Sequence, residues 1–227
     1  MRPLYSFWLL SAILRNPILA LIVLAFIYAV IDQQFIGVLP DFTKPFRRNS
    51  RIRSLRAEIE RSPFNAAASQ ELGLLLVEQG SYEEAAKRLQ SALERMPENS
   101  NVRLGLGIAL YNLGEYEQAV AEIQEAIKLN PKAGYGLPNV YLLMNELRLG
   151  ESGDSAVIAD LIEKILSYGS PEVLYRSGVA LQQVGDKDGA KRMFSAAVSN
   201  YRSFPGRVRK LHRRWAYAAW LRNATIR

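Results

Sequence analysis

Two stretches of this chain carry one pattern twice and decide its fold. Residues 72–97 read LGLLLVEQGSYEEAAKRLQSALERMP, and residues 106–131 read LGIALYNLGEYEQAVAEIQEAIKLNP. A proline closes each stretch, and Pro63, Pro97 and Pro131 stand 34 residues apart. A period of this length indicates an array of helical repeats, because a single repeat cannot bury its apolar face without a neighbour stacked on it.

The residues that the two stretches share are those that let helices pack closely. The matched pairs are Leu72 with Leu106, Gly73 with Gly107, Leu76 with Leu110, Gly80 with Gly114, Tyr82 with Tyr116, Ala85 with Ala119, Leu89 with Ile123 and Ala92 with Ala126. Glycine and alanine allow two helices to approach where a larger side chain would hold them apart. Gly80 and Gly114 suit the turn that ends a helix, and each proline ends one hairpin and begins the next.

This pattern resembles the tetratricopeptide repeat (TPR) family, which has Leu-Gly in the first helix of each repeat, alanine and a large apolar residue in the second, and a closing proline. The resemblance covers about residues 50–204 and implies an all-α solenoid of helical hairpins with about three full repeats. A further repeat reads LYRSGVALQQVGDKDGAKRMFSAAVSN over residues 174–200, where Ser177 replaces the expected leucine. The chain also looks similar end to end to bacterial membrane-anchored TPR proteins, a group that implies a topology but no biochemical role.

The repeat that precedes residue 174 is altered. Pro138 fits the first turn of a helix that runs to about Leu149, and Asp154 can cap a second helix that ends near Tyr168. We interpret the turn at residues 134–136, Gly-Tyr-Gly, as a bend in the solenoid, with a ligand site as the alternative. It is not a phosphate loop, because no Lys-Ser/Thr follows it and no strand precedes it.

Residues 40–62 are expected to form a basic linker and a half-repeat helix before the array, which we place at residues 63–204. In this segment Ile52, Leu55 and Ile59 fall on one helical face. This spacing predicts the second helix of an incomplete repeat.

Residues 1–39 predict a membrane anchor. From Pro17 to Ile31 the chain has no charged or strongly polar residue. A helix needs about 20 residues to cross a bilayer, so we predict a transmembrane helix over residues 17–39, with Asp32 towards one interface, and an interfacial helix over residues 3–15. The alternatives are a cleaved signal peptide and a buried helix of a soluble protein.

Basic residues on either side of this helix set its expected orientation. Arg2 and Arg15 precede it, and a larger basic group follows it: Lys44, Arg47, Arg48, Arg51, Arg53 and Arg56. The positive-inside rule places the more basic side in the cytoplasm. We therefore expect a single-pass protein of the cell inner (cytoplasmic) membrane with a cytoplasmic array.

The net charge of +7 is unevenly distributed. Residues 1–56 hold eight Arg/Lys and two Asp/Glu, residues 57–190 hold eleven and twenty, and residues 191–227 hold ten and none. The basic flanks can lie on anionic headgroups, which predicts a membrane-contact surface of Lys44, Arg47, Arg48, Arg51, Arg213, Arg214 and Trp220. A lipid-surface protein that organises a membrane is therefore the alternative function. Nucleic-acid binding is less favoured, because the acidic centre repels phosphate.

Nothing in the sequence selects a catalytic site. The chain has no cysteine and one histidine, so it lacks a cysteine nucleophile and has too little imidazole for the usual zinc site or histidine triad. The acidic residues are expected mostly on solvated helix faces. We expect no enzyme activity, no cofactor and no metal.

The TPR resemblance implies that the first helix of each repeat lines a concave groove that binds protein or peptide partners. On this register the groove residues are Gln70, Leu74, Val77, Glu78, Asn101, Ile108, Tyr111, Asn112, Tyr175, Val179 and Gln182. Gln70 and Gly105 stand where some relatives place a lysine that clamps a peptide carboxylate, which argues against that activity. Tyr111 and Tyr175 either anchor a partner or pack between hairpins. The leading hypothesis is a membrane-anchored scaffold.

Residues 205–227 are expected to form a basic helix that caps the array, because the last hairpin would otherwise leave one face uncovered. Val208, Leu211, Trp215, Ala218 and Ala219 share a stripe at helical spacing that can cover the last hairpin. Tyr217 and Trp220 fall outside this stripe, which leaves a membrane or partner contact open.

Overall fold

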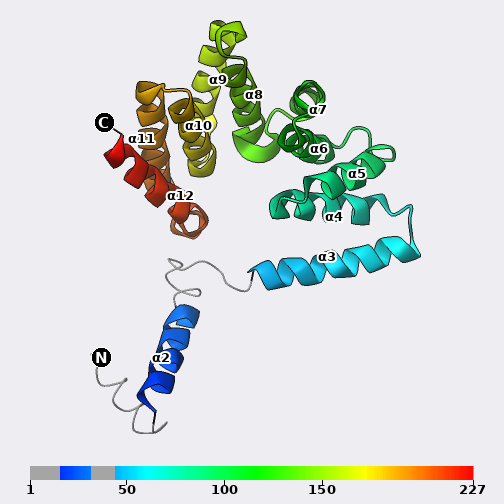
Figure 1. Cartoon of the computed structure of the whole chain (residues 1–227), viewed down its shortest axis with the longest axis vertical. Coiled ribbons are helices and arrows are strands. Elements are labelled where there is room, and N and C mark those ends of the chain that lie inside the picture. The colour runs from blue at the N-terminus through cyan, green and yellow to red at the C-terminus, as the bar shows by residue number, and fades with distance from the viewer. Residues whose placement is uncertain (1–15, 32–43, 227) are drawn as a thin grey trace. The chain divides into compact units, whose positions relative to one another are not determined.

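The computed structural model describes residues 16–31 and 44–226, and within them it contains helices and no strand (Figure 1). The α-helices are α2 (Pro17–Ile31), α3 (Lys44–Arg61), α4 (Ala66–Gln79), α5 (Tyr82–Leu93), α6 (Ser100–Leu113), α7 (Tyr116–Leu129), α8 (Leu137–Leu149), α9 (Ser155–Tyr168), α10 (Pro171–Gln183), α11 (Lys187–Ser203) and α12 (Gly206–Thr225). Two 3-10 turns, η2 (Ala133–Gly136) and η3 (Gly150–Ser152), flank α8. The expected all-α class is confirmed.

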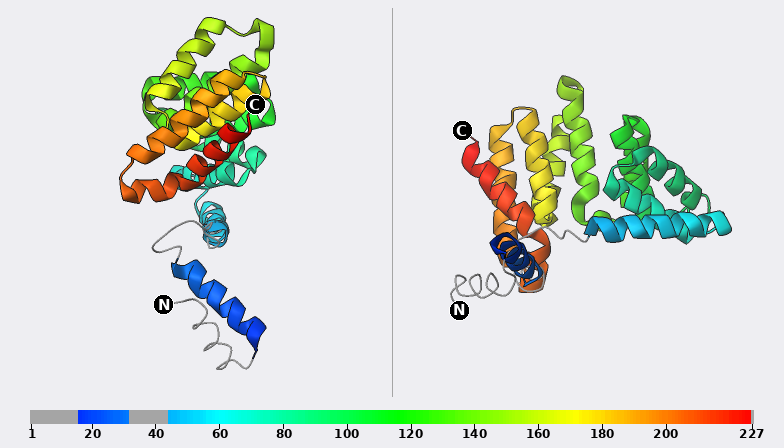
Figure 2. Two further views of the ribbon diagram at one scale, coloured as in Figure 1. Left: turned by 90° about the vertical axis from the view of Figure 1, so that its left-hand side faces the viewer. Right: turned by 60° about the horizontal axis from the view of Figure 1, so that its bottom comes forward.

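The chain divides into two compact units, residues 1–44 and residues 45–227. In the second unit, successive helices pack as hairpins, α4 with α5, α6 with α7, α8 with α9 and α10 with α11. Figures 1 and 2 show these hairpins following one another along the array. The predicted helical-hairpin solenoid is therefore confirmed.

Glycines in the first helix of each full repeat sit against the second helix. A Cβ atom added to Gly107 would lie 2.6 Å from Cγ1 of Ile123 and 3.1 Å from the carbonyl oxygen of Ala119. A Cβ atom on Gly178 would lie 2.6 Å from Cε1 of Phe194. The two carbon–carbon distances of 2.6 Å are shorter than a van der Waals contact allows. The close approach of the two helices that was inferred from the sequence is therefore confirmed.

The apolar residues of the second unit form three buried clusters. Leu72 belongs to the cluster of α3 to α7, Ile123 to the cluster of α6 to α8, and Phe194 to the cluster of α8 to α12. All cluster members lie within residues 52–226. Residues 45–227 therefore hold complete cores of their own and are able to fold without residues 1–44.

The half-repeat helix α3 packs on the array as expected, with Ile52, Leu55 and Ile59 buried. It begins at Lys44, so most of residues 40–62, which were expected to hold a linker and a helix, is helical. The basic residues of α3 also fasten it to the array. Arg56 forms a bidentate ion pair with Glu84 on α5, in which Nε and Nη2 donate to the two carboxylate oxygens at 3.1 and 2.6 Å.

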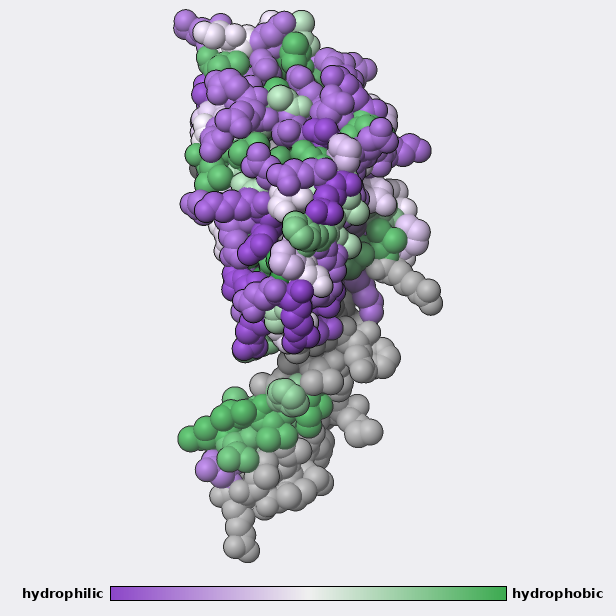
Figure 3. All heavy atoms as spheres, turned by 90° about the vertical axis from the view of Figure 1, so that its right-hand side faces the viewer, coloured by the Kyte–Doolittle hydropathy of each residue, from purple (hydrophilic) through white to green (hydrophobic). Residues whose placement is uncertain are grey.

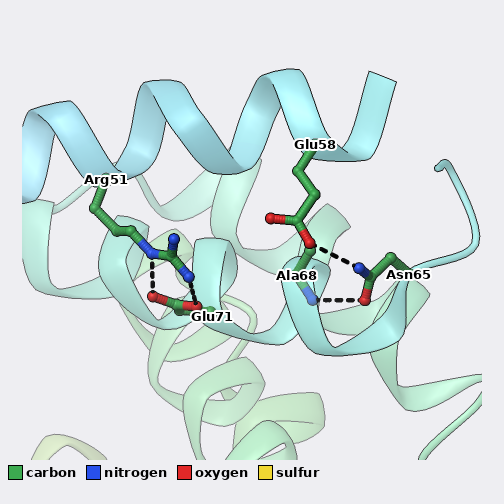
Figure 4. Close-up of polar contacts among 5 residues, drawn as sticks. All are labelled: Arg51, Glu58, Asn65, Ala68 and Glu71. Carbon is green, nitrogen blue, oxygen red and sulfur yellow. Dashed lines mark hydrogen bonds and ion pairs between the residues drawn. The ribbon is translucent and has the colours of Figure 1, made fainter. Parts of the chain in front are cut away.

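A second bidentate ion pair joins α3 to α4 (Figure 4). Nε and Nη2 of Arg51 donate to the two carboxylate oxygens of Glu71, at 2.6 and 2.5 Å. Nearby, Asn65 caps α4 by accepting a hydrogen bond from the amide of Ala68, and its side-chain amide donates to Glu58 of α3 at 2.9 Å. Polar contacts therefore join α3 to the α4 region at two points.

The Arg51–Glu71 pair makes the docking of α3 depend on pH. Hydrogen bonding to Arg51 has the largest effect on the Glu71 carboxyl and lowers its pKa, against a smaller opposing effect of burial. A lowered folded-state pKa contributes stability above the unfolded pKa of about 4.3, and this contribution is lost as the pH falls through the folded value. We expect Glu71→Gln to lower the Tm at neutral pH, and we expect its difference from the parent protein to shrink as the pH falls below the unfolded pKa of about 4.3.

The measurement is a thermal melt of both proteins across this pH range, with Glu60→Gln, at an exposed carboxylate of α3, as the matched control. A Tm difference between parent and Glu71→Gln that stays constant with pH would contradict this account.

The altered repeat follows the expected course. Asp154 caps α9 by accepting hydrogen bonds from the amides of Ala156 and Val157. The η2 turn bends the chain because its last three residues, 134–136, are left-handed, with φ of 61°, 49° and 90°. A Cβ atom on Gly134 would lie 2.7 Å from Cδ2 of Leu104, so the turn packs on α6. This is the bend predicted for the solenoid.

Helix α12 packs on α10 and α11 and closes the array. The predicted stripe is wrong in part, because Val208 and Leu211 are exposed, Leu211 by 73%. The rest of the predicted stripe faces the array, with Ala219 buried and Trp215 and Ala218 half-buried, and Ala216, which the stripe did not include, is buried beside Ala219. Alanines let α12 approach closely, so its buried side includes Ala216 and Ala219 and leaves out Val208 and Leu211.

The first unit is described only by α2. The side chain of Asn16 caps this helix by accepting hydrogen bonds from the amides of Ile18 and Leu19. Apolar side chains gather over α2 in Figure 3, whereas the side of the array in view is mainly polar. Within residues 16–31 and 44–226 no helix is both long and apolar enough to cross a membrane. Residues 3–15 and 32–39 of the predicted anchor lie outside the described residues.

Candidate functional site

The predicted groove residues lie on the first helices of the three full repeats. Four are on α4 (Gln70, Leu74, Val77 and Glu78), four on α6 (Asn101, Ile108, Tyr111 and Asn112) and three on α10 (Tyr175, Val179 and Gln182). We call the side of the array made by α4, α6, α8 and α10 the first-helix face. In the structure, some of these residues pack within the array and others are exposed.

The aliphatic residues of this set mainly join neighbouring repeats. Ile108 is buried, and Leu74, Val77 and Val179 are half-buried and pack against the apolar clusters. A Cβ atom on Gly105 would lie 2.7 Å from Cδ2 of Leu74, so Leu74 fills the space that this glycine leaves. These side chains stabilise the array and leave little apolar surface for a partner.

Tyr111 belongs to an aromatic cluster between α6, α7 and α8. Its ring meets Tyr116 edge-on at 5.1 Å between centroids and Tyr141 at 5.3 Å. The guanidinium carbon of Arg148 lies over the Tyr116 ring, 3.9 Å from its centroid. This is a cation–π contact, in which the negative face of the ring attracts the cation. Burial raises the pKa values of the Tyr111 and Tyr141 phenols above the ordinary value of a tyrosine. The cluster ties the regular repeats to the altered one.

Tyr175 is covered by α12. Its ring lies 5.8 Å from Phe194 and 5.4 Å from Trp215. Arg222 of α12 donates to the hydroxyl of Tyr175 at 3.2 Å and to Oε1 of Gln182 at 2.8 Å. Both predicted tyrosine anchors therefore pack within the array, and their contact with a partner stays a prediction.

The polar residues remain more accessible. Asn101, Asn112 and Glu78 are exposed, while Gln70 accepts a hydrogen bond from Asn99 at 3.2 Å. The side-chain amide of Asn112 donates to the carbonyl of Ile108 in its own helix at 2.7 Å, which holds the amide in place.

Polar side chains of α6 and α10 act on one buried phenol of α8, that of Tyr141. Burial has the largest effect and raises the pKa of Tyr141. Arg176 and a hydrogen bond with Asn112 lower this pKa, whereas Tyr82 and Glu172 raise it. Arg176 on α10 is exposed and pairs with Glu172 at 2.8 Å. We define the central patch as the buried Tyr141 of α8 together with Asn112 of α6 and with Glu172 and Arg176 of α10, the side chains of these two first helices that act on its phenol. The sequence analysis did not name Tyr141, because α8 does not follow the repeat register. It did not name Glu172 or Arg176 of α10 either, because their effect on Tyr141 depends on the packing of α10 against α8.

The predicted membrane-contact residues also differ in their surroundings. Arg48 donates to the carbonyl of Glu78 at 3.3 Å, and Arg51 pairs with Glu71, so both contribute to the docking of α3. Lys44 and Arg47 are exposed at the start of α3. On α12, Arg213 lies near the Tyr201 hydroxyl at 3.5 Å, Arg214 lies 4.7 Å from the Trp215 ring centroid, and Trp220 is exposed.

No group of three or more His, Cys, Asp or Glu side chains within the described parts of the chain is arranged to hold a metal ion. The first-helix face instead offers amides, phenols and a guanidinium. These groups donate and accept hydrogen bonds to a peptide backbone or to polar side chains.

Comparisons with known proteins agree with this architecture. Sequence profiles described as tetratricopeptide repeat match residues 52–87, 76–142 and 172–203. No curated protein sequence matches the chain.

Three solved structures illustrate the likeness of fold. TTC0263, a thermophilic TPR protein in Thermus thermophilus, is 17% identical with a TM-score of 0.57, over 82% of this chain and 96% of that chain. A tetratricopeptide repeat protein from Parabacteroides merdae is 16% identical with a TM-score of 0.54, over 79% and 67%. MamA is 21% identical with a TM-score of 0.53, over 73% and 97%.

The repeat pattern, the stacked hairpins and the profile matches point to one conclusion. TPR proteins are generally non-catalytic scaffolds, and their fold indicates protein or peptide partners. The chain belongs to the tetratricopeptide repeat family.

Proposed function

We propose that this protein is a membrane-anchored scaffold that binds protein partners through the first-helix face at the cytoplasmic side of the inner membrane. The observation that carries the proposal is the central patch, where Asn112 of α6 and Arg176 of α10 are exposed and both act on the buried phenol of Tyr141 on α8. A partner peptide bound there would exchange hydrogen bonds with an amide that the α6 backbone already orients.

Membrane anchoring is the second part of the proposal. Its support is the apolar sequence from Pro17 to Ile31, together with the apolar residues 35–39 that follow it. The cytoplasmic orientation rests on the basic residues that follow residue 43.

A photo-crosslinking amino acid placed at Asn112 of the full chain is expected to give discrete protein adducts in cells, because this side chain is an exposed member of the central patch. The matched control places the same amino acid at Gln124, which is exposed on α7, a second helix of a repeat. The adducts should sediment with membranes and resist extraction at alkaline pH.

The two readouts separate the two parts of the proposal. Equal adducts from both positions would argue against binding by the first-helix face. Release of the protein by alkaline extraction would argue against a spanning anchor.

A further inference from the structure

The exposed side of α12 carries cationic and apolar side chains together. We call Arg209, Lys210, Arg214, Tyr217, Trp220 and Leu221 the outer face of α12, because all six are exposed while Ala216 and Ala219 face the array. Tyr217 is 64% exposed and Trp220 is 53% exposed, and their rings lie 5.8 Å apart. Closing the array accounts for the opposite side of this helix and leaves the outer face without a role.

The charge of this region has one sign. Residues 191–227 contain ten basic residues and no acidic residue. The outer face therefore attracts a polyanionic surface and repels an identical face on a second copy of the chain.

The apolar side chains narrow the choice of polyanion. Tyrosine and tryptophan favour the headgroup level of a bilayer, where the ring is in an apolar layer and its polar atom in water. Leu221, 49% exposed on the same side, gains from the acyl boundary but gains nothing from a phosphodiester chain. A helix with arginines beside tryptophan and leucine matches the composition of helices that lie in the interface of anionic membranes.

We propose that the outer face of α12 docks on the surface of an anionic lipid bilayer, with its arginines on lipid phosphates and Tyr217, Trp220 and Leu221 at the acyl boundary. This contact is independent of the first-helix face and of the anchor in residues 1–39. It would hold the C-terminal end of the array at the membrane as well as the N-terminal end.

Residues 45–227 test this inference without the anchor, because this unit contains all three apolar clusters. The expected result is co-flotation with vesicles of phosphatidylglycerol and phosphatidylcholine at low salt, and none with pure phosphatidylcholine. Arg209→Glu/Arg214→Glu should weaken binding by about 30-fold or more, because each basic residue contributes about a factor of five near an anionic surface. Tyr217→Ser/Trp220→Ser should weaken it by about tenfold.

The matched control is Lys87→Glu/Lys132→Glu, which changes the net charge equally at exposed sites on the rest of the array and should leave binding within about twofold. Trp220 provides a direct readout, because Trp215→Phe leaves it as the one tryptophan of residues 45–227. Its emission should shift to shorter wavelength with anionic vesicles and be quenched by brominated lipid.

Four results would overturn the inference. Two come from flotation: no binding to anionic vesicles at low salt, or an equal loss of binding in Lys87→Glu/Lys132→Glu. The others are a Trp220 emission that anionic vesicles leave unchanged, and salt-sensitive retention on nucleic acid without vesicle binding.

Discussion

Phe194→Ala is expected to lower the free energy of unfolding of residues 45–227 by about 3–5 kcal/mol, the range for removing a buried phenylalanine ring. Phe194 is fully buried and fills the space above Gly178, where its ring also meets Tyr175. The same apolar cluster contains Ala219, so loss of the ring opens a cavity where α10, α11 and α12 meet. Urea unfolding followed by far-UV circular dichroism measures the change.

The matched control for this variant is Phe64→Ala. Phe64 is 75% exposed, and its ring lies 4.7 Å from the guanidinium carbon of Arg95. Its removal should cost no more than about 1 kcal/mol, the usual size of an exposed cation–π contact. If the two variants unfold at the same urea concentration, the packing of Phe194 against Gly178 does not have the role assigned to it.

The loss from Phe194→Ala should also be local. In a repeat array, each repeat interacts mainly with its neighbours, so destabilisation at one end opens that end first. Amide hydrogen exchange should therefore quicken in α10, α11 and α12 before it quickens in α4 and α5. Equal acceleration in all helices would show instead that the array unfolds as one unit.

Gly107→Val is expected to lower the free energy of unfolding by about 3 kcal/mol, at the upper end of the range for overpacking. The first added carbon would lie 2.6 Å from Cγ1 of Ile123 and 3.1 Å from the backbone oxygen of Ala119, and the two γ-methyl groups need further space. The side chain of Ile123 can move only slightly inside a packed core, and the helix backbone cannot withdraw without breaking the α6–α7 contact.

The matched control is Gly206→Val. This glycine begins α12, and an added Cβ atom there would meet no other atom within 4 Å. Thermal melts should therefore give a Tm for Gly206→Val close to that of the parent protein and a much lower Tm for Gly107→Val. A Gly107→Val protein as stable as the control would mean that α6 and α7 can separate at no cost, contrary to the close packing described above.

Most of the fold was predictable because its determinants repeat in the sequence. The 34-residue spacing, Gly73 and Gly107, and the alanines of the second helices all recur in register. The irregular turn at Gly134 and the cap of α9 at Asp154 were also predictable, since both depend on residues a few positions apart.

The candidate site was predictable only in outline. The register placed residues on the first helices correctly, but it could not tell that Tyr111 packs on Tyr141 and that Arg222 covers Tyr175. Tyr175 and Arg222 are 47 residues apart in the chain, and no repeat relates them. The membrane-contact set likewise included Arg51, whose partner Glu71 lies on another helix.

The sequence by itself determined the all-α repeat architecture, the close helix pairs and the altered repeat, because small residues at a constant period leave one way to stack the hairpins. Only the tertiary structure decided which side of each helix remains open. Helix α12 shows why, since the helical period allowed Val208 and Leu211 on the buried side, whereas contact with α10 and α11 leaves both exposed and buries Ala216 beside Ala219. Burial of a helix face depends on neighbours distant in the chain, and these exist only after the array has packed.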